Sequence, residues 1–341
     1  MRLSTRLGYA GAFRRTAERV SELEKAGIDL FWVAEAYGFD AATQLGYLAA
    51  VTERAQLGSG IFNIYSRTPA LLAQTAAGLD EVSQGRAVLG LGASGPQVIE
   101  GFHGVPYDRP VQRTREIIEI VRKVWRREAL RHDGPCYQLP LKDGTGLGKP
   151  IKILTHPVRD RIPIFLASLG EKSVQLTAEQ AEGWLPIFYL PEKAQAVWGN
   201  ALRRGEANRR PGLPPLDIAA GGPLAIGDNV VHLREQERPH LALYIGGMGA
   251  RGKNFYNDLI ASYGFEQEAS TIQDLYLSGQ KEAAAAAVPD TLLERLSLVG
   301  PASFVRERIE ALRASGVTTL DVQPIGDDPV GDVARVKEWI S

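Results

Sequence analysis

Short apolar runs that alternate with helix-length amphipathic stretches constrain the fold of this chain more than any other feature of its sequence. Eight runs are predicted to be strands: residues 3–9, 30–35, 56–62, 87–92, 162–168, 183–188, 216–226 and 319–324. Amphipathic stretches typical of helices separate most of them: residues 13–26, 41–53, 69–83, 111–130, 171–181 and 191–210. Strands separated by helices pair in parallel through right-handed crossovers, which predicts the α/β class. Eight such strands favour a closed (β/α)8 TIM barrel over an open sheet.

Two segments interrupt this alternation, and we predict that they are insertions in a single domain spanning residues 1–341. Residues 132–161 are rich in glycine and proline, and residues 227–300 contain the stretch YIGGMGARGKNFYNDLIASYGF. Both segments are too long for tight turns. They could fold over one face as a lid or build an oligomer interface. Within the second segment, Arg251 and Lys253 could close over a substrate or an anionic cofactor tail, or could merely pack.

The charge balance and the lack of long apolar runs limit the partners of the chain. Lys and Arg total 39 against 40 for Asp and Glu, so no excess charge favours nucleic acid or an anionic membrane. No run of about 18 apolar residues occurs, and the N-terminal residues lack the apolar core of a signal peptide. The single cysteine, Cys136, excludes an internal disulfide and fits a reducing compartment. We therefore expect a cytoplasmic protein with no nucleic-acid or membrane partner.

A glycine-rich motif, GLGASG at residues 90–95, resembles two known functional patterns without satisfying either. The G-x-G-x-x-G pattern of a Rossmann fold follows the first strand and precedes an acidic strand end by about 20 residues, but Glu116 and Glu119 lie in a predicted helix. The G-x-S-x-G turn of hydrolases would need glycine where Pro96 stands. These glycines could instead let a flat cofactor or a phosphate approach the backbone, or could form only a tight turn.

Two further strand ends carry small and polar residues. In LASLGEKS, Gly170, Lys172 and Ser173 would place backbone amides, an ammonium and a hydroxyl at the start of a helix. This combination is typical of an anion site, although many such turns bind no ligand. In GSGIFN, small residues and Asn63 end the third predicted strand, which could also be an ordinary strand end.

Glu35 ends the second predicted strand in VAEAYGFD, at the rim where barrel enzymes carry their catalytic residues. A carboxylate there could hold a cofactor or shuttle a proton, or could serve only as a charge at a helix N-terminus. The five histidines show no spacing typical of metal ligands: His103, His132, His156, His232 and His240. We therefore predict no metal site.

Three long segments resemble the F420-dependent branch of the bacterial-luciferase-like (LLM class) oxidoreductases. They are FWVAEAYGFDA, the stretch that runs from LGSGIFNIYSRTPALL to TREIIEIVRKVW, and PIFLASLGEKSVQLTAEQAEGWLP, and together they cover most of residues 1–200. The C-terminal third is similar only in its general layout. The resemblance implies a (β/α)8 barrel that binds coenzyme F420, a deazaflavin, at the C-terminal ends of its strands. It also implies a homodimer and hydride transfer between reduced F420 and an organic substrate.

The resemblance further implies where the cofactor would bind. A non-prolyl cis peptide between Gly60 and Ile61 would form a bulge under the deazaflavin ring. The ring or its ribityl chain would contact Glu35, Asn63, Ala93 and Ser94. The cofactor phosphate would be held by Leu169, Gly170, Lys172 and Ser173, in agreement with the anion site described above.

Two positions depart from related enzymes. In the similar sugar-phosphate dehydrogenases, a histidine and a glutamate do acid–base work where this chain has Ala36 and Gly95, which argues against oxidation of a hexose phosphate. We predict Glu35 as the catalytic residue, and our hypothesis is that Glu35 or Tyr37 relays the proton that accompanies hydride transfer. An FMN-dependent monooxygenase or reductase is an alternative, because both cofactors share a tricyclic ring and a ribityl phosphate. A non-catalytic F420-binding carrier is a second alternative, since the chain lacks those two acid–base residues.

Overall fold

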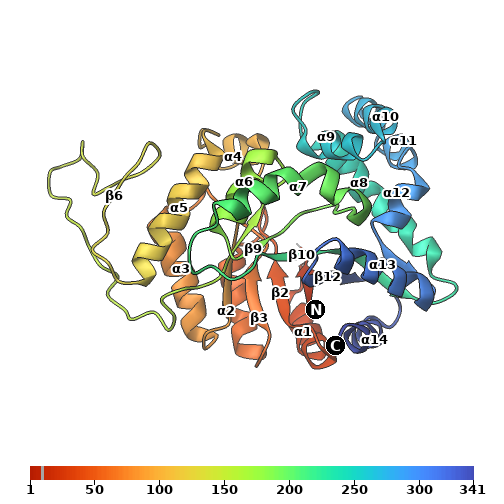
Figure 1. Cartoon of the computed structure of the whole chain (residues 1–341), viewed down its shortest axis with the longest axis horizontal. Helices are drawn as coiled ribbons and strands as arrows, with labels where there is room; N and C mark the ends of the chain where they lie inside the picture. The colour runs from red at the N-terminus through yellow and green to blue at the C-terminus, as the bar shows by residue number, and fades with distance from the viewer. Residues whose placement is uncertain (9–10) are drawn as a thin grey trace.

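The computed structural model describes residues 1–8 and 11–341 and shows a ring of parallel strands surrounded by helices (Figure 1). The strands of the ring are β1 (Arg2–Leu7), β2 (Leu30–Val33), β3 (Gln56–Ser59), β5 (Ala87–Gly92), β8 (Ile164–Ala167), β9 (Gly183–Trp184), β10 (Asp217–Ile226) and β12 (Thr319–Pro324). They pair in the order β12–β1–β2–β3–β5–β8–β9–β10, and β10 pairs with β12. This closed order confirms the predicted (β/α)8 barrel.

Both faces of the strands are apolar because side chains fill the interior of the barrel and helices cover its outer surface. All four residues of β2 and all six of β5 are buried. Within the barrel, Trp32 and Phe165 pack with their ring centroids 5.2 Å apart. Glycines make room for these rings: a Cβ added to Gly58 would lie 2.4 Å from the Trp32 indole, and one added to Gly183 would lie 2.1 Å from Phe165. The interior is therefore a filled core, as expected for a small parallel barrel.

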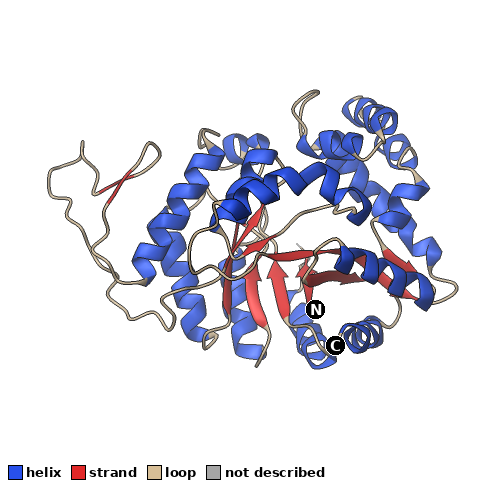
Figure 2. Cartoon of the chain, viewed as in Figure 1, coloured by secondary structure: helices blue, strands red, loops and turns tan. Residues whose placement is uncertain are grey.

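The outer helices confirm the predicted alternation (Figure 2). They are α1 (Phe13–Ala26), α2 (Ala41–Val51), α3 (Pro69–Val82), α5 (Pro110–Trp125), α6 (Glu171–Gln180), α7 (Pro191–Ala207), α13 (Ala302–Ala314) and α14 (Pro329–Ile340). Local signals set several ends: the Asp40 and Thr68 side chains cap α2 and α3, and Gly27 ends α1 in the left-handed conformation. The sequence analysis did not predict α13 and α14, and it extended α5 to residue 130.

Several predicted strands are shorter in the structure. The predicted run 56–62 is divided into β3 and a two-residue strand β4 (Phe62–Asn63). The predicted run 183–188 ends at Trp184, and the run 3–9 ends at Leu7, with residue 9 outside the described residues. The apolar runs continue past the ends of these strands because the loops above the barrel also bury apolar side chains. The length of an apolar run therefore overestimates the length of the hydrogen-bonded strand.

The two predicted insertions differ in structure. Residues 132–161 contain only a short antiparallel pair, β6 (His132–Asp133) and β7 (Gln138–Leu139), and otherwise form an irregular arm that projects from the barrel (Figure 1). Residues 227–300 form a helical cap of η1 (Val231–Glu237), α8 (Arg238–Ala242), η2 (Leu243–Gly247), α9 (Phe255–Ser262), α10 (Glu266–Leu277), α11 (Lys281–Ala286) and α12 (Asp290–Arg295). The cap returns to the barrel as β11 (Leu298–Gly300), which pairs with β10.

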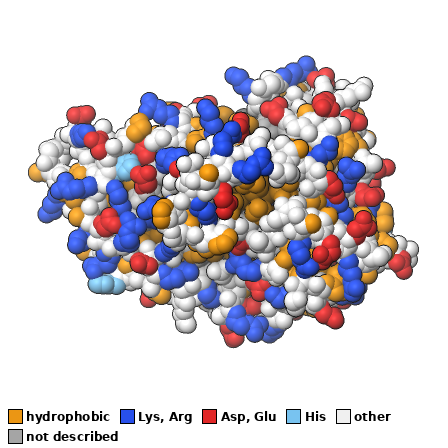
Figure 3. All heavy atoms as spheres, in the orientation of Figure 1, with side chains coloured by type: hydrophobic (Ala, Val, Ile, Leu, Met, Phe, Trp, Pro, Cys, Tyr) orange, Lys and Arg blue, Asp and Glu red, His pale blue; other side chains and the backbone are white. Residues whose placement is uncertain are grey.

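The surface has no dominant sign of charge on the face shown in Figure 3. Lys, Arg, Asp and Glu are mixed over most of this face, and apolar side chains gather in a hollow near its middle. Among residues 1–8 and 11–341, no helix combines the length and apolar character needed to cross a membrane.

Candidate functional site

The C-terminal ends of the barrel strands meet at one rim, and the residues predicted to bind a cofactor occupy one half of it. They follow β2, β3, β5 and β8, which are consecutive neighbours in the barrel. We call this half the β2–β8 arc. The other half is formed by the ends of β9, β10, β12 and β1, and we call it the β9–β1 arc. Closure of the barrel thus brings segments more than 100 residues apart into one site.

The turn between β3 and β4 contains the cis peptide bond between Gly60 and Ile61 that the sequence analysis predicted. Close approaches fix this turn. A Cβ added to Gly60 would lie 2.9 Å from the Trp32 Cβ, and one added to Gly90 would lie 1.8 Å from the Ser59 carbonyl oxygen. The Ser59 hydroxyl also donates to the Gly90 carbonyl at 2.8 Å and accepts from its N–H at 3.0 Å. The backbone therefore presents a rigid, side-chain-poor surface at the barrel mouth.

Glu35 forms an ion pair with Arg67, a residue that the sequence analysis did not single out. The pair joins Oε1 to Nη1 at 2.5 Å and Oε2 to Nη2 at 2.8 Å, with side chains only 9% and 12% exposed. Glu35 also accepts from the N–H of Ala41, at the start of α2. Arg67 binds Asp40 as well and lies over the Phe62 ring at 4.3 Å. This geometry suits a positioning role for Glu35, because its carboxylate is held by a fixed cation.

Asn63 and His103 join two neighbouring loops of the arc. The buried Asn63 side chain accepts from the N–H groups of Tyr65 at 3.0 Å and Ser66 at 2.7 Å, and its Nδ2 lies 3.3 Å from His103 Nε2. Asn63 therefore holds the loop after β4 in place and touches the segment that follows β5.

The residues that end β5 are more accessible. Ala93 is half-buried, and Ser94 is exposed with a positive φ of 57°. The Ser94 carbonyl accepts from the Tyr107 hydroxyl at 3.4 Å. Tyr37, the second candidate for proton relay, is 68% exposed, and its ring lies 6.3 Å from that of Phe102.

The start of α6 has the features predicted for an anion site. Gly170 is the N-cap, and among the described residues no side chain caps this helix. The Ser173 hydroxyl donates to the Gly170 carbonyl at 2.7 Å, and the Leu169 carbonyl accepts from Trp198 Nε1 at 2.9 Å. Lys172 is exposed beside them. The first amides of α6 are therefore oriented by their neighbours and left without a side-chain acceptor, which suits a phosphate.

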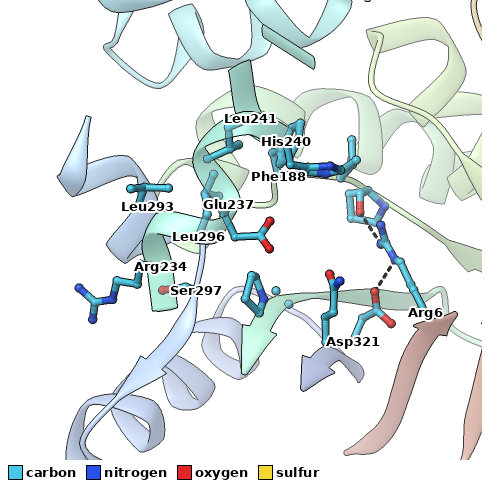
Figure 4. Close-up of a pocket in the computed structure, with 16 residues that line it drawn as sticks. Arg6, Phe188, Arg234, Glu237, His240, Leu241, Leu293, Leu296, Ser297 and Asp321 are labelled. Carbon is cyan, nitrogen blue, oxygen red and sulfur yellow. Dashed lines mark hydrogen bonds and ion pairs between the residues drawn. The ribbon is translucent and has the colours of Figure 1, made fainter. Parts of the chain in front are cut away.

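The β9–β1 arc encloses a cavity of about 90 Å³ that the sequence analysis did not predict (Figure 4). Its lining comes from four barrel strands or the loops after them and from three elements of the helical cap, η1, α8 and α12. Arg6 at the end of β1 pairs with Asp321 on β12 at 2.6 Å, and Asp321 also accepts from the Ser4 hydroxyl at 2.8 Å. Charged residues inside two predicted apolar strands were the only sequence signal for this site.

Two titratable residues of the helical cap face this cavity, Glu237 and His240. Burial raises the pKa of the Glu237 carboxyl above its ordinary value. Burial, together with the charge of Arg6, lowers the pKa of the His240 imidazole. The His240 ring packs 4.7 Å from Tyr244 and 5.9 Å from Phe188. His240 keeps an exposed surface, and these two aromatic rings flank its imidazole.

Other polar groups of the two insertions lie outside this lining. Arg251 pairs with Asp274 at 2.8 Å within the helical cap, and Lys253 is exposed. Neither residue lines the cavity of the β9–β1 arc. Across the part of the chain that the structure describes, no group of three or more His, Cys, Asp or Glu residues is arranged to hold a metal ion.

Comparisons with known proteins place this geometry in context. A model of the luciferase-like monooxygenase family matches residues 1–319. The chain is 41% identical to a Mycobacterium tuberculosis protein whose name proposes a coenzyme F420-dependent oxidoreductase, over 98% of this chain and 99% of that protein. The fold is similar to that of the F420-dependent tetrahydromethanopterin reductase of Methanopyrus kandleri, with a TM-score of 0.82, 21% identity and coverage of 99% and 97%. It is also similar to an FMN-bound diketocamphane monooxygenase component from Pseudomonas putida, with a TM-score of 0.64, 20% identity and coverage of 100% and 97%.

Proposed function

The chain belongs to the luciferase-like monooxygenase family, and we propose that it is a coenzyme F420-dependent oxidoreductase that acts on a small organic molecule. The name of its 41% identical M. tuberculosis relative supports this assignment. The observation that carries it is the β2–β8 arc, where a side-chain-poor backbone turn and an uncapped helix N-terminus share one side of the barrel mouth. That pair of features fits a cofactor with a flat ring and a phosphate.

The residues of the β2–β8 arc would divide the binding of the cofactor among them. The backbone of Gly60 and Ile61 would support the ring, with Ala93 and Ser94 beside it and Asn63 holding the adjoining loop. The first amides of α6 would hold the phosphate, through the residues Leu169, Gly170, Lys172 and Ser173. When bound, the deazaflavin supplies the hydride chemistry, and the protein supplies position and electrostatics.

Glu35 would act mainly by placing the loop that follows β2. Its pairing with Arg67 ties that loop to the loop after β4, and its contact with Ala41 ties it to α2. A carboxylate that accepts two hydrogen bonds from one guanidinium is held in a fixed position. Proton relay through Glu35 stays a prediction, and the variants Glu35→Gln and Glu35→Asp test it.

FMN is the alternative cofactor, because an FMN-bound protein shares this fold. Titrating the protein with F420 and, separately, FMN distinguishes the two through quenching of tryptophan fluorescence. Trp32 packs against Gly60 below the proposed ring position, so bound cofactor should quench its emission. Micromolar or tighter binding of F420 with weak FMN binding is the expected result. Preference for FMN would move the protein to the flavin-dependent branch, and binding of neither would refute the assignment of the β2–β8 arc.

The second alternative is a non-catalytic F420 carrier. It differs from an enzyme in one measurable respect, because a carrier would bind F420 stoichiometrically without oxidising reduced F420 in the presence of a broad panel of carbonyl compounds. Turnover with any member of the panel, followed by the deazaflavin absorbance, would exclude it.

We also propose a homodimer in the cytoplasm. The arm formed by residues 132–161 leaves large apolar side chains uncovered, with Leu147 85% exposed and Leu154 91% exposed. A second copy of the chain would cover them. Sedimentation velocity should show a dimer that Leu154→Asp converts to monomer, whereas Lys149→Ala on the same arm should not. A cytoplasmic location is consistent with the single free thiol, Cys136.

A further inference from the structure

The cavity of the β9–β1 arc contains one acidic group without a partner. The Glu237 side chain points toward the side of the cavity where Arg6 and Asp321 lie (Figure 4). Among the described residues, no side chain or backbone group forms a hydrogen bond or ion pair with its carboxyl group. A partly buried carboxyl group without a partner is disfavoured in its charged form, so the protonated acid is the form that the cavity stabilises.

The other polar groups around the cavity are already engaged or neutral. Asp321 neutralises Arg6, which also reaches the Pro186 carbonyl at 3.5 Å. Arg234 points out of the cavity and binds the Val299 carbonyl and Glu294. Burial and the charge of Arg6 lower the pKa of His240, which favours the neutral imidazole and disfavours the imidazolium form that could donate a proton. Among the described residues that line the cavity, Glu237 is thus the carboxyl group that is free to donate a proton.

Much of the remaining lining is apolar, apart from the uncharged side chains of Ser297 and Gln323, and it indicates the kind of molecule that fits. Phe188, Leu241, Leu293 and Leu296 line the same cavity as Glu237. Of the two arginines in the lining, Arg234 points away from the cavity and Arg6 is balanced by Asp321. A charged ligand would lose its hydration without gaining an unpaired charged partner. A compact, uncharged molecule with one hydrogen-bond acceptor could pack against the apolar side chains and accept a hydrogen bond from the Glu237 carboxyl group.

We propose that this cavity is the substrate chamber, that it takes a compact, uncharged carbonyl compound, and that Glu237 delivers the proton that accompanies reduction. The proposal rests on the proposed function, which supplies the reductant. The carbonyl carbon takes a hydride, with its two electrons, from a reduced deazaflavin on the β2–β8 arc. The C=O π pair moves to oxygen, which takes the proton of the Glu237 carboxyl and becomes an alcohol. Water then returns a proton to Glu237.

Binding of cyclohexanone as a probe tests the chamber without requiring turnover. Ligand-observed NMR would measure its affinity from about pH 4, near the ordinary pKa of a glutamate, to the highest pH at which the protein stays folded, because the pKa of Glu237 is raised. The wild-type protein should bind cyclohexanone about tenfold more weakly once Glu237 loses its proton, because the hydrogen bond to the carbonyl is lost. Glu237→Gln should bind it with no such pH dependence, because the amide donates at every pH.

Two further variants test whether the probe binds in this cavity and not elsewhere on the protein. Leu293→Trp should fill the chamber and abolish binding of the probe, whereas Glu266→Gln, an exposed carboxylate on α10, should match the wild type. Failure of the wild type to bind cyclohexanone, or an unchanged pH dependence in Glu237→Gln, would overturn the proposal. If Leu293→Trp does not fold, the pH dependence of cyclohexanone binding in Glu237→Gln and the wild type still tests the proposal.

An F420 titration of the same proteins distinguishes failure of this inference from failure of the proposed function. Normal F420 binding with no probe binding would refute the chamber alone. The expected probe binding without F420 binding would refute the cofactor assignment alone. With both sites supported, a carbonyl substrate should be reduced by Glu237→Gln with kcat lowered at least tenfold and the descending limb of the pH profile removed, while KM changes little.

Discussion

The two halves of the barrel rim differ in whether backbone or side chains form their surface. The β2–β8 arc is formed largely by backbone: the Gly60–Ile61 turn, the glycines of β5 and the first amides of α6. The β9–β1 arc is formed largely by side chains, and several of them, including Glu237 and His240, come from a helical cap inserted between β10 and β12. A backbone-built site requires glycines at fixed places and so leaves a pattern in the sequence. A site built from side chains of a distant insertion leaves almost none.

The largest expected effect comes from adding one methyl group to the backbone-built arc. Gly90→Ala would place a Cβ 1.8 Å from the Ser59 carbonyl oxygen, a contact that only a shift of the backbone can relieve. We expect a loss of about 3 kcal/mol in the free energy of unfolding and loss of F420 binding. Urea denaturation and the F420 titration measure these effects. Gly46→Ala in α2, where a Cβ meets nothing within 4 Å, is the control and should be neutral or stabilising.

Glu35→Gln tests whether the β2–β8 arc also depends on a charge. The substitution keeps the shape of the side chain but leaves Arg67 with only Asp40 as its anionic partner. We expect F420 affinity or turnover to fall at least about tenfold, because the two loops are no longer held by a fully charged pair. Glu35→Asp, which keeps the charge, should recover part of the loss if Glu35 acts by position. Wild-type kinetics in Glu35→Gln would dismiss both the positioning and the relay roles.

A third prediction concerns the pH dependence of stability in the β9–β1 arc. Because burial raises the pKa of Glu237 in the folded state, the folded protein holds this proton more tightly than the unfolded chain does. The protonated carboxyl group therefore contributes to the free energy of unfolding. This contribution is fully present below the pKa that Glu237 has in the unfolded chain, and it is lost as the pH rises through the pKa that Glu237 has in the folded protein. Glu237→Gln should therefore unfold at a higher temperature than the wild type at pH 8 but at nearly the same temperature at pH 4. Parallel melting curves at both pH values would contradict this.

The smallest expected effect is at the exposed edge of the phosphate site. Lys172→Ala should weaken F420 binding only about threefold at low salt, because the α6 amides remain and an exposed charge is screened by water and ions. Raising the salt concentration should reduce the difference between variant and wild type. Lys149→Ala, at another exposed lysine, provides the control. A loss as large as that expected for Glu35→Gln would mean that the side chain, and not the helix amides, binds the phosphate.

Local patterns were reliable where the structure depends on local interactions. Residues 87–92 and 319–324 form β5 and β12 as predicted, and Gly27 ends α1. The cis bond between Gly60 and Ile61 was also correctly located, by resemblance to a family. Strand ends were less reliable: the run 183–188 forms a strand only to Trp184, because apolar loop residues beyond it pack above the barrel without pairing. The sequence pointed to Glu35 as a candidate site residue, but its ion-pair partner Arg67, 32 residues away, was not predicted.

The sequence by itself determined the barrel, because alternating apolar strands and amphipathic helices have few ways to bury their surfaces. It also determined the backbone-built arc, since only glycine tolerates the close approaches at Gly58, Gly60 and Gly90. Only the tertiary structure decided that Glu237 and His240 of the helical cap face the Arg6–Asp321 pair across one cavity. Residues 231–240 carry no periodic relation to residue 6 or residue 321. Their proximity follows from barrel closure and from the path of an insertion, which are properties of the whole packed chain.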